Sequence, residues 1–157
     1  MLTRDDTTIL LCYVIPELID VGGPWKVLPP GVHCASPEAI KERFATNARR
    51  EYLFGGFLAG FTILRDAGSK AILLDGSFVT DKPEPGDFDC CWDPTSVDVS
   101  KLHPTLLDFS NDRAAQKATF RGEFFPSTVP AVPGEFFLSF FQTDKYTGRA
   151  KGILLVQ

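Results

Sequence analysis

The sequence has neither a surplus of positive charge nor a long hydrophobic run. It carries 16 Lys and Arg against 20 Asp and Glu, a formal net charge of -4, whereas proteins that coat nucleic acid need many cations to displace counterions from the phosphates. The apolar stretch from Ile9 to Ile15 is too short to span a bilayer and ends at Pro16. We therefore expect a cytoplasmic protein without a membrane anchor, in which at most a local basic groove contacts nucleic acid.

The sequence also lacks the cysteine spacing of a zinc site or a disulfide scaffold. Cys12 and Cys34 are isolated, and Cys90 and Cys91 are adjacent, so no CxxC pair is present. Adjacent residues of a strand point to opposite faces of the sheet. We expect reduced, structural thiols, as is usual in a reducing cytoplasm.

Length and composition predict a single domain over residues 1–157. A content of 44% hydrophobic and 23% charged residues is that of an ordinary globular chain that can bury one core. Residues 1–35 are expected to form an extended N-terminal lead-in. Within it, Gly22-Gly23-Pro24 and Pro29-Pro30-Gly31 place turn formers too densely for a long regular element.

Apolar spacing and cap residues predict helices in the first half of the chain and strands in the second. Ser36-Pro37-Glu38 is typical of a helix start, and a short helix should run to about Asn47. A long amphipathic helix is expected over 49–67, where three glycines should be compensated by close packing against another element. We further expect strands over 70–75, 87–92, 122–126, 136–142 and 153–156, and a helix over 113–120. This order predicts an α/β (α+β) fold.

The segment that indicates chemistry runs from Gly76 to Asp89. In a strand, Asp87 and Asp89 would present two carboxylates to one face, and such a pair suits Mg²⁺, or Mn²⁺, which accepts one or two carboxylates together with substrate phosphates. The turn Gly76-Ser77 lets the backbone approach a ligand closely and adds a hydroxyl, so it is a candidate phosphate-binding turn.

A Gly-Ser turn followed by Asp-x-Asp on the next strand resembles the signature of the nucleotidyltransferase superfamily, and in particular of its minimal members. Beyond this motif, the sequence resembles that of one uncharacterised bacterial family in the segments 28–33, 43–47, 74–80, 85–89 and 140–142. The resemblance implies a nucleotidyltransferase-like mixed sheet flanked by N-terminal helices. It also implies Mg²⁺-dependent transfer of a nucleoside monophosphate from a nucleoside triphosphate to a hydroxyl of RNA or protein. Several relatives act in bacterial toxin-antitoxin or phage-defence modules, so a cognate toxin or antitoxin is an implied partner.

The chain departs from the superfamily pattern after Phe78. Minimal nucleotidyltransferases carry Arg-Gly there, at the start of a helix, whereas this sequence has Val79-Thr80-Asp81-Lys82. Lys82 is the candidate to replace the missing arginine as a phosphate contact. A third carboxylate completes the metal site in the family, and Glu123 is favoured for that role over Asp108.

Several of these residues also have plain structural interpretations. We expect Trp92 to pack in the core, Arg113 and Lys117 to lie on a solvated helix face, and Asp75 to accept a hydrogen bond beside the loop. The departure after Phe78 leaves a second functional hypothesis open: a degenerate nucleotidyltransferase core that binds a partner protein without catalysing transfer.

Overall fold

The computed structural model describes residues 14–157, so Cys12 and most of the apolar stretch 9–15 lie outside the described residues. The helices are α2 (Pro37–Phe44), α3 (Ala48–Asp66), α4 (Ser110–Phe120) and α5 (Phe137–Phe140), with the 3-10 turns η1 (Ser77–Val79), η2 (Val99–Lys101) and η3 (Pro104–Leu107). The strands are β1 (Gly31–Ala35), β2 (Ile72–Asp75), β3 (Asp89–Trp92), β4 (Glu123–Pro126), β5 (Pro130–Val132), β6 (Glu135–Phe136) and β7 (Gly152–Val156). Across residues 14–157, no helix is long and apolar enough to cross a membrane.

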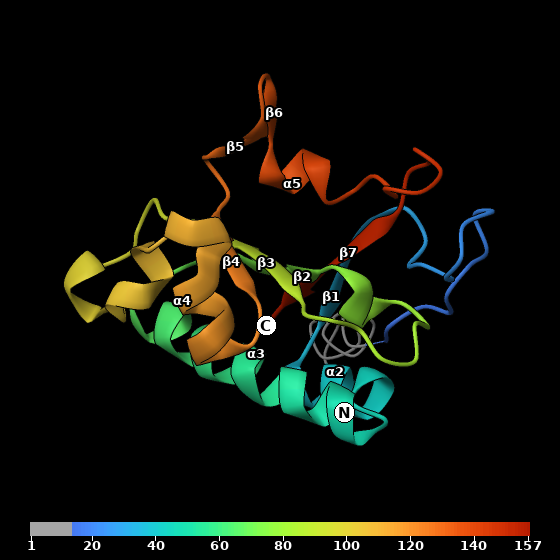
Figure 1. Cartoon of the computed structure of the whole chain (residues 1–157), viewed down its shortest axis with the longest axis horizontal. Helices are drawn as coiled ribbons and strands as arrows, with labels where there is room; N and C mark the ends of the chain where they lie inside the picture. Colours follow the sequence, from blue (N-terminus) through green and yellow to red (C-terminus); the bar gives the residue numbers. More distant parts are fainter. Residues whose placement is uncertain (1–13) are drawn as a thin grey trace, which may run out of the picture.

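Five strands form a mixed sheet in the order β1-β7-β2-β3-β4, and β5 pairs only with β6. The outer pairs, β1 with β7 and β3 with β4, are parallel, whereas β2 is antiparallel to both β7 and β3. Figure 1 shows helices α2, α3 and α4 on one side of the sheet, and α5 with the β5–β6 hairpin on the other. The α+β prediction of a mixed sheet flanked by N-terminal helices is therefore confirmed.

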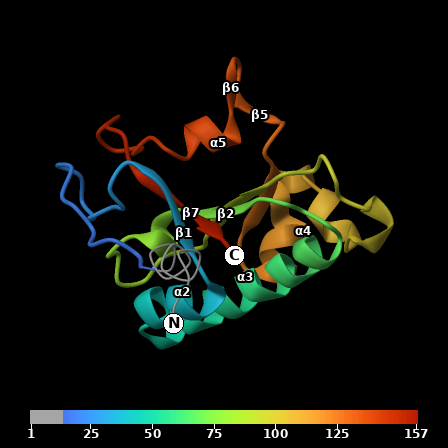
Figure 2. The same cartoon turned by 180° about the vertical axis from the view of Figure 1, so that it is seen from behind.

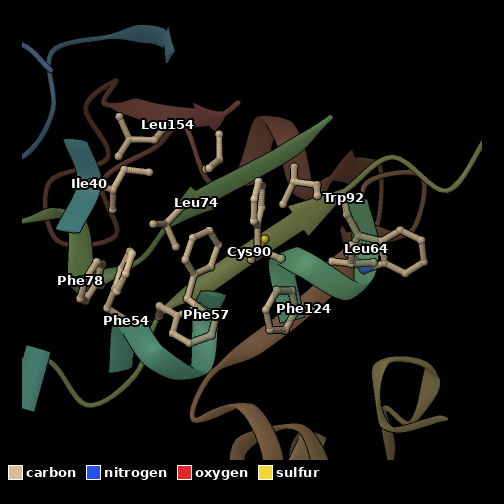
Figure 3. Packing of buried hydrophobic residues seen from close by; sticks show 14 of the residues in the cluster. Ile40, Phe54, Phe57, Leu64, Leu74, Phe78, Cys90, Trp92, Phe124 and Leu154 are labelled. Atoms are coloured by element: carbon tan, nitrogen blue, oxygen red, sulfur yellow. The ribbon is translucent and has the colours of Figure 1, made fainter. Parts of the chain in front are cut away.

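The two faces of the sheet have separate apolar clusters. Leu74, Cys90 and Phe124 pack with the helices in the larger cluster, and Figure 3 shows the rings of Phe54 and Phe57 from α3 beside Leu74 and Cys90. The alternate strand residues, which point the other way, belong to the second cluster, whose buried members are Leu73, Cys91, Phe125, Phe141 and Ile153. The expected opposite orientation of Cys90 and Cys91 is confirmed.

Two glycines of helix α3 permit a close approach, Gly56 to the end of α4 and Gly60 to strand β4 of the sheet. A Cβ added at Gly56 would lie 1.9 Å from the backbone oxygen of Phe120, and one at Gly60 would lie 2.3 Å from the ring of Phe124. The expected compensation by close packing is thus confirmed at both positions. The ends of the helix also follow local signals, because Asn47 accepts a hydrogen bond from the amide of Arg50 and Gly68 has φ +102°.

The predicted strand over 136–142 is wrong. Strand β6 ends at Phe136, and the next residues turn into the short helix α5. The helical turn places Phe137 and Phe141 on the same side, with ring centroids 4.1 and 6.0 Å from that of Phe125. An extended chain would not bring two residues four apart onto one ring, so the tertiary packing of the aromatic side chains overrides their preference for strands.

Two boundaries also differ from the prediction. The last residues of the expected lead-in, 31–35, form strand β1 at the edge of the sheet, paired in parallel with β7. Strand β3 begins at Asp89, so Asp87 lies in the loop before the strand. The two aspartates therefore come from a loop and a strand end.

Candidate metal and nucleotide site

Three acidic side chains form one row across adjacent strands of the sheet. Asp75 is the register partner of Asp89 in the antiparallel pair β2–β3, and Asp89 is the partner of Glu123 in the parallel pair β3–β4. Partners in register point to the same face. Leu73, Cys91 and Phe125, two residues along each strand, belong to the second apolar cluster, so the acidic row lies on the face of the sheet that α5 occupies.

Cations neutralise the two outer acids of this row. Lys151, just before β7, forms an ion pair with Asp75. Glu123 pairs with two cations of α4, at 3.1 Å from Nε of Arg113 and 2.9 Å from Nζ of Lys117.

No lysine or arginine among residues 14–157 forms an ion pair with Asp89 or with the nearby Asp87. Burial raises the pKa of the Asp87 carboxyl, and the charge of Glu123 raises it further. Burial and the neighbouring carboxylates of Asp87, Asp75 and Glu123 raise the pKa of Asp89 to about 8. A carboxylate so crowded by negative charge is stabilised by any cation that reaches it.

The turn that follows β2 packs closely against Asp89. Gly76 has φ +84°, and a Cβ at this position would lie 2.8 Å from Oδ2 of Asp89 and 2.9 Å from its amide nitrogen. Only glycine combines this left-handed backbone with so close a contact. Ser77 follows as the first residue of η1, so the turn lies directly against the carboxylate of Asp89.

The carboxylates of Asp75, Asp87 and Asp89 open onto a cavity of about 290 Å³, which the turn also lines. The remaining wall comes from the N-terminal segment, the residue after η1, β6, α5 and the loop before β7. Its residues are Trp25, Val27, Thr80, Glu135, Phe140, Phe141, Thr143, Asp144, Lys145, Tyr146 and Lys151. Within residues 14–157, no three His, Cys, Asp or Glu side chains are grouped as a ready-made metal site. Two of the carboxylates that line the cavity, those of Asp87 and Asp89, therefore have no paired cation.

The stability of the metal-free protein should depend on pH through Asp89. Between the ordinary value of 3.8 and the folded-state pKa of about 8, the folded protein keeps a proton that the unfolded chain has lost. The contribution of protonated Asp89 to the free energy of unfolding is therefore complete below about pH 4 and is lost as the pH rises towards 8. Asp89→Asn has no such loss. In EDTA, the stability of this variant relative to wild type should therefore increase between pH 5 and pH 8, as should the difference between their melting temperatures. A shift of one pKa unit corresponds to about 1.4 kcal/mol, and we expect the free energy of unfolding of the variant, relative to wild type, to increase by more than ~1 kcal/mol over this pH range. A difference in melting temperature that stays constant over this range would contradict the assignment.

A family model matches residues 23–157, and its description is that of a family of unknown function (DUF6932). The chain belongs to this DUF6932 family. No curated protein and no solved structure matches the chain. Every residue of the cavity wall lies within the matched residues 23–157.

The structure separates the residues that the sequence grouped. Glu123 lies beside Asp89, whereas Asp108 accepts hydrogen bonds from the amide and hydroxyl of Ser110, at the start of α4. Lys82 lines a different cavity, next to Arg43 and Asn47. Trp92 is 2% exposed and belongs to the larger cluster, which confirms its expected place in the core.

Sequence reasoning missed three features of the site. Asp75 accepts a hydrogen bond as expected, but it does so from Lys151 and from within strand β2. Arg113 and Lys117 lie on a partly exposed helix face, as expected, but they also form ion pairs with Glu123, which the sequence did not predict. Residues 111–113 have left-handed backbone angles, and this distortion was not readable from the sequence. The role of Lys151 was only weakly indicated by the sequence, as a single cation just before an apolar segment.

Proposed function

We propose that this DUF6932 protein is a Mg²⁺-dependent nucleotidyltransferase that moves a nucleoside monophosphate from a triphosphate to a hydroxyl of RNA or protein. One observation carries the proposal: Asp87 and Asp89, which lack a paired cation, meet the Gly76-Ser77 turn in one cavity. This arrangement combines a place for a hard cation with a place for phosphates. The element order α3, β2, turn, β3 around it supports the resemblance drawn from the sequence.

The donor set fits Mg²⁺, or Mn²⁺, bound together with a substrate. Mg²⁺ typically takes one or two carboxylates and completes its octahedral shell with phosphate oxygens and water. Asp87 and Asp89 would supply the two carboxylates, and the lack of a third free acid is expected for a site that a triphosphate completes. A bound divalent ion would supply Lewis-acid stabilisation of charge on the phosphates.

The residues of the chain would divide the remaining work. The turn at Gly76 and the Ser77 hydroxyl would hold phosphate oxygens, and Lys151, which faces the cavity, is a better placed phosphate contact than Lys82. In the transfer step, the acceptor hydroxyl oxygen forms a bond to the α-phosphorus while the bond to the β-phosphate oxygen breaks and pyrophosphate leaves. Glu123 is the candidate to take the proton of that hydroxyl.

The first test is ligand-induced stabilisation. At a concentration about a hundredfold above its dissociation constant, a ligand of the folded state adds roughly 2.7 kcal/mol, which is about 5–10 °C for a domain of this size. Wild type should show this shift with a nucleoside triphosphate plus Mg²⁺, and Asp87→Asn should lose most of it. Asp108→Asn is the matched control, because this acid lies outside the cavity, and it should keep the full shift.

Transfer itself is tested with a triphosphate labelled at the α-phosphate. Label should appear on RNA or protein with wild type and Asp108→Asn, and should not appear with Asp87→Asn. Absence of both the shift and the label with all four nucleotides would overturn the nucleotide-binding proposal.

The pairing of Glu123 with Arg113 and Lys117 favours a second candidate function. Because both carboxylate oxygens of Glu123 already contact these cations, no free carboxylate is left to act as the base. The core would then bind a nucleotide and a partner protein, such as a cognate toxin or antitoxin, without catalysing transfer. A thermal shift without label transfer is the result that distinguishes this binding module from the enzyme.

A further inference from the structure

The cavity that holds the acids also has an aromatic portion. Trp25, Phe140, Phe141 and Tyr146 line it together with Asp87 and Asp89. These rings come from two distant segments, the N-terminal segment and the chain between α5 and β7. In both Figure 1 and Figure 2 these segments lie side by side at one end of the sheet. A ligand that fills the cavity therefore meets charge in one part and flat apolar surface in another.

The segment that carries Trp25 is fixed on both sides of that residue. On one side, the amide of Lys26 donates to Oδ1 of Asp81 at 2.7 Å, and a two-way backbone bridge joins Ile19 to Val27. On the other side, Gly23 packs against the 144–147 turn, where a Cβ would meet Oδ2 of Asp144 at 3.4 Å. The backbone on both sides of Trp25 is thus held in place before any ligand arrives.

Of the four rings, Trp25 is the one without an aromatic or cation–π contact to residues 14–157. Phe140 packs on Phe137 and Phe141. Phe141 is buried in the second cluster and packs on Phe125 and Phe137. Tyr146 has the ammonium of Lys145 over its ring, 5.1 Å from the centroid. By contrast, no aromatic ring and no cation of residues 14–157 packs on the half-buried ring of Trp25.

We propose that Trp25 stacks on the nucleobase of the nucleoside triphosphate whose phosphates lie at Gly76 and Asp89. This inference rests on the proposed function, because the acids and the turn must hold the phosphates for the base to reach Trp25. Stacking on an aromatic ring uses the π-face that every base has. Trp25 therefore contributes affinity for the base without specificity for one of the four bases. The N-terminal segment is then part of the binding site.

The test compares Mg²⁺-ATP with Mg²⁺-tripolyphosphate, which has the phosphates but no base. Wild type should bind ATP about 10-fold or more tightly than tripolyphosphate in isothermal titration. Trp25→Ala should weaken ATP binding about 10-fold and leave the affinity for tripolyphosphate unchanged, and Trp25→Phe, which keeps a ring, should recover most of the loss. Trp25 and Trp92 are the two tryptophans of the chain, and Trp92 is in the core, so ATP should quench tryptophan fluorescence in wild type but not in Trp25→Phe.

The outcomes separate this inference from the proposed function. Equal affinity of wild type for the two ligands, or equal weakening of both by Trp25→Ala, overturns stacking while the phosphate site stands. Failure of both ligands to bind wild type overturns the proposed function and the stacking with it. A urea unfolding curve of Trp25→Ala that matches wild type excludes misfolding as the cause of a lost affinity.

Discussion

Replacing Gly56 by alanine should destabilise the protein by about 3 kcal/mol or more, the upper range for overpacking of a close contact. The added methyl group would lie 1.9 Å from the backbone oxygen of Phe120 and 3.1 Å from Cβ of Arg121. These are backbone and near-backbone atoms at the end of α4, so no rotamer change can remove the clash. Helix α3 would have to move away from α4. Urea unfolding followed by circular dichroism measures the loss.

Gly55→Ala is the matched control in the same helix. Its added methyl group would meet only the tip of the Arg121 side chain, 3.2 Å from Nη1, and a flexible tip can move aside. Alanine in a helix interior is favoured over glycine by up to ~1 kcal/mol, so this variant should be neutral or slightly more stable. Equal destabilisation by the two substitutions would mean that α3 does not approach α4 at Gly56.

Arg50→Met should cost about 3 kcal/mol and should loosen the loop that follows the Gly76-Ser77 turn. The guanidinium of Arg50 is buried and donates to the backbone oxygens of Phe44, Phe78, Thr80 and Lys82. Methionine keeps the apolar stem but leaves these oxygens without their donors, and a buried acceptor without a partner costs ~1–3 kcal/mol. Chemical unfolding gives the loss of stability, and protease cleavage within 79–86 reports the loosened loop.

Arg49→Met serves as the comparison for Arg50. Arg49 also donates to loop oxygens, those of Pro85 and Gly86, but from a more exposed position where water can replace it. We expect a loss of no more than about 1 kcal/mol. If the nucleotide site depends on the loop, Arg50→Met should also reduce the Mg²⁺-nucleotide shift, whereas Arg49→Met should keep it. A loss in Arg49→Met as large as in Arg50→Met would contradict the special role of Arg50.

The parts of the fold that were predictable depend on signals local in the sequence. The start of α2 could be predicted because Ser36 and Pro37 are adjacent to the residues they cap, and Ser36 does accept the amide of Ala39 at 3.1 Å. Strand β1 was not predictable, because its five residues directly follow the turn formers Pro29 and Pro30 and its partner β7 lies near the other end of the described chain. Helix α5 was predicted as a strand for a related reason: Phe125, the ring on which α5 packs, belongs to a separate element, strand β4.

The site divides in the same way. The spacing of Asp87 and Asp89 and the turn at Gly76 are visible within fourteen consecutive residues, so the sequence could nominate them. The alignment of Asp75 and Glu123 with Asp89 depends on strand register, which only the assembled sheet fixes. The pairing of Arg113 and Lys117 with Glu123 joins α4 to β4 and likewise exists only in the folded chain. Arg50 donates to backbone oxygens of Phe78 and Thr80, roughly 30 residues away, which no local pattern around Arg50 indicates.

The position of β7 constrains how the molecule can fold. This strand is late in the sequence, yet it lies between β1 and β2 and joins the edge strand to the rest of the sheet. During synthesis, β1 leaves the ribosome long before β7, its partner among residues 14–157, exists. Until residues 152–156 emerge, β1 lacks this partner and β2 has an open edge. Such long-range pairing slows folding and leaves strand edges exposed to aggregation in the meantime. Because Lys151 directly precedes β7, the cation that pairs with Asp75 reaches the cavity together with that strand.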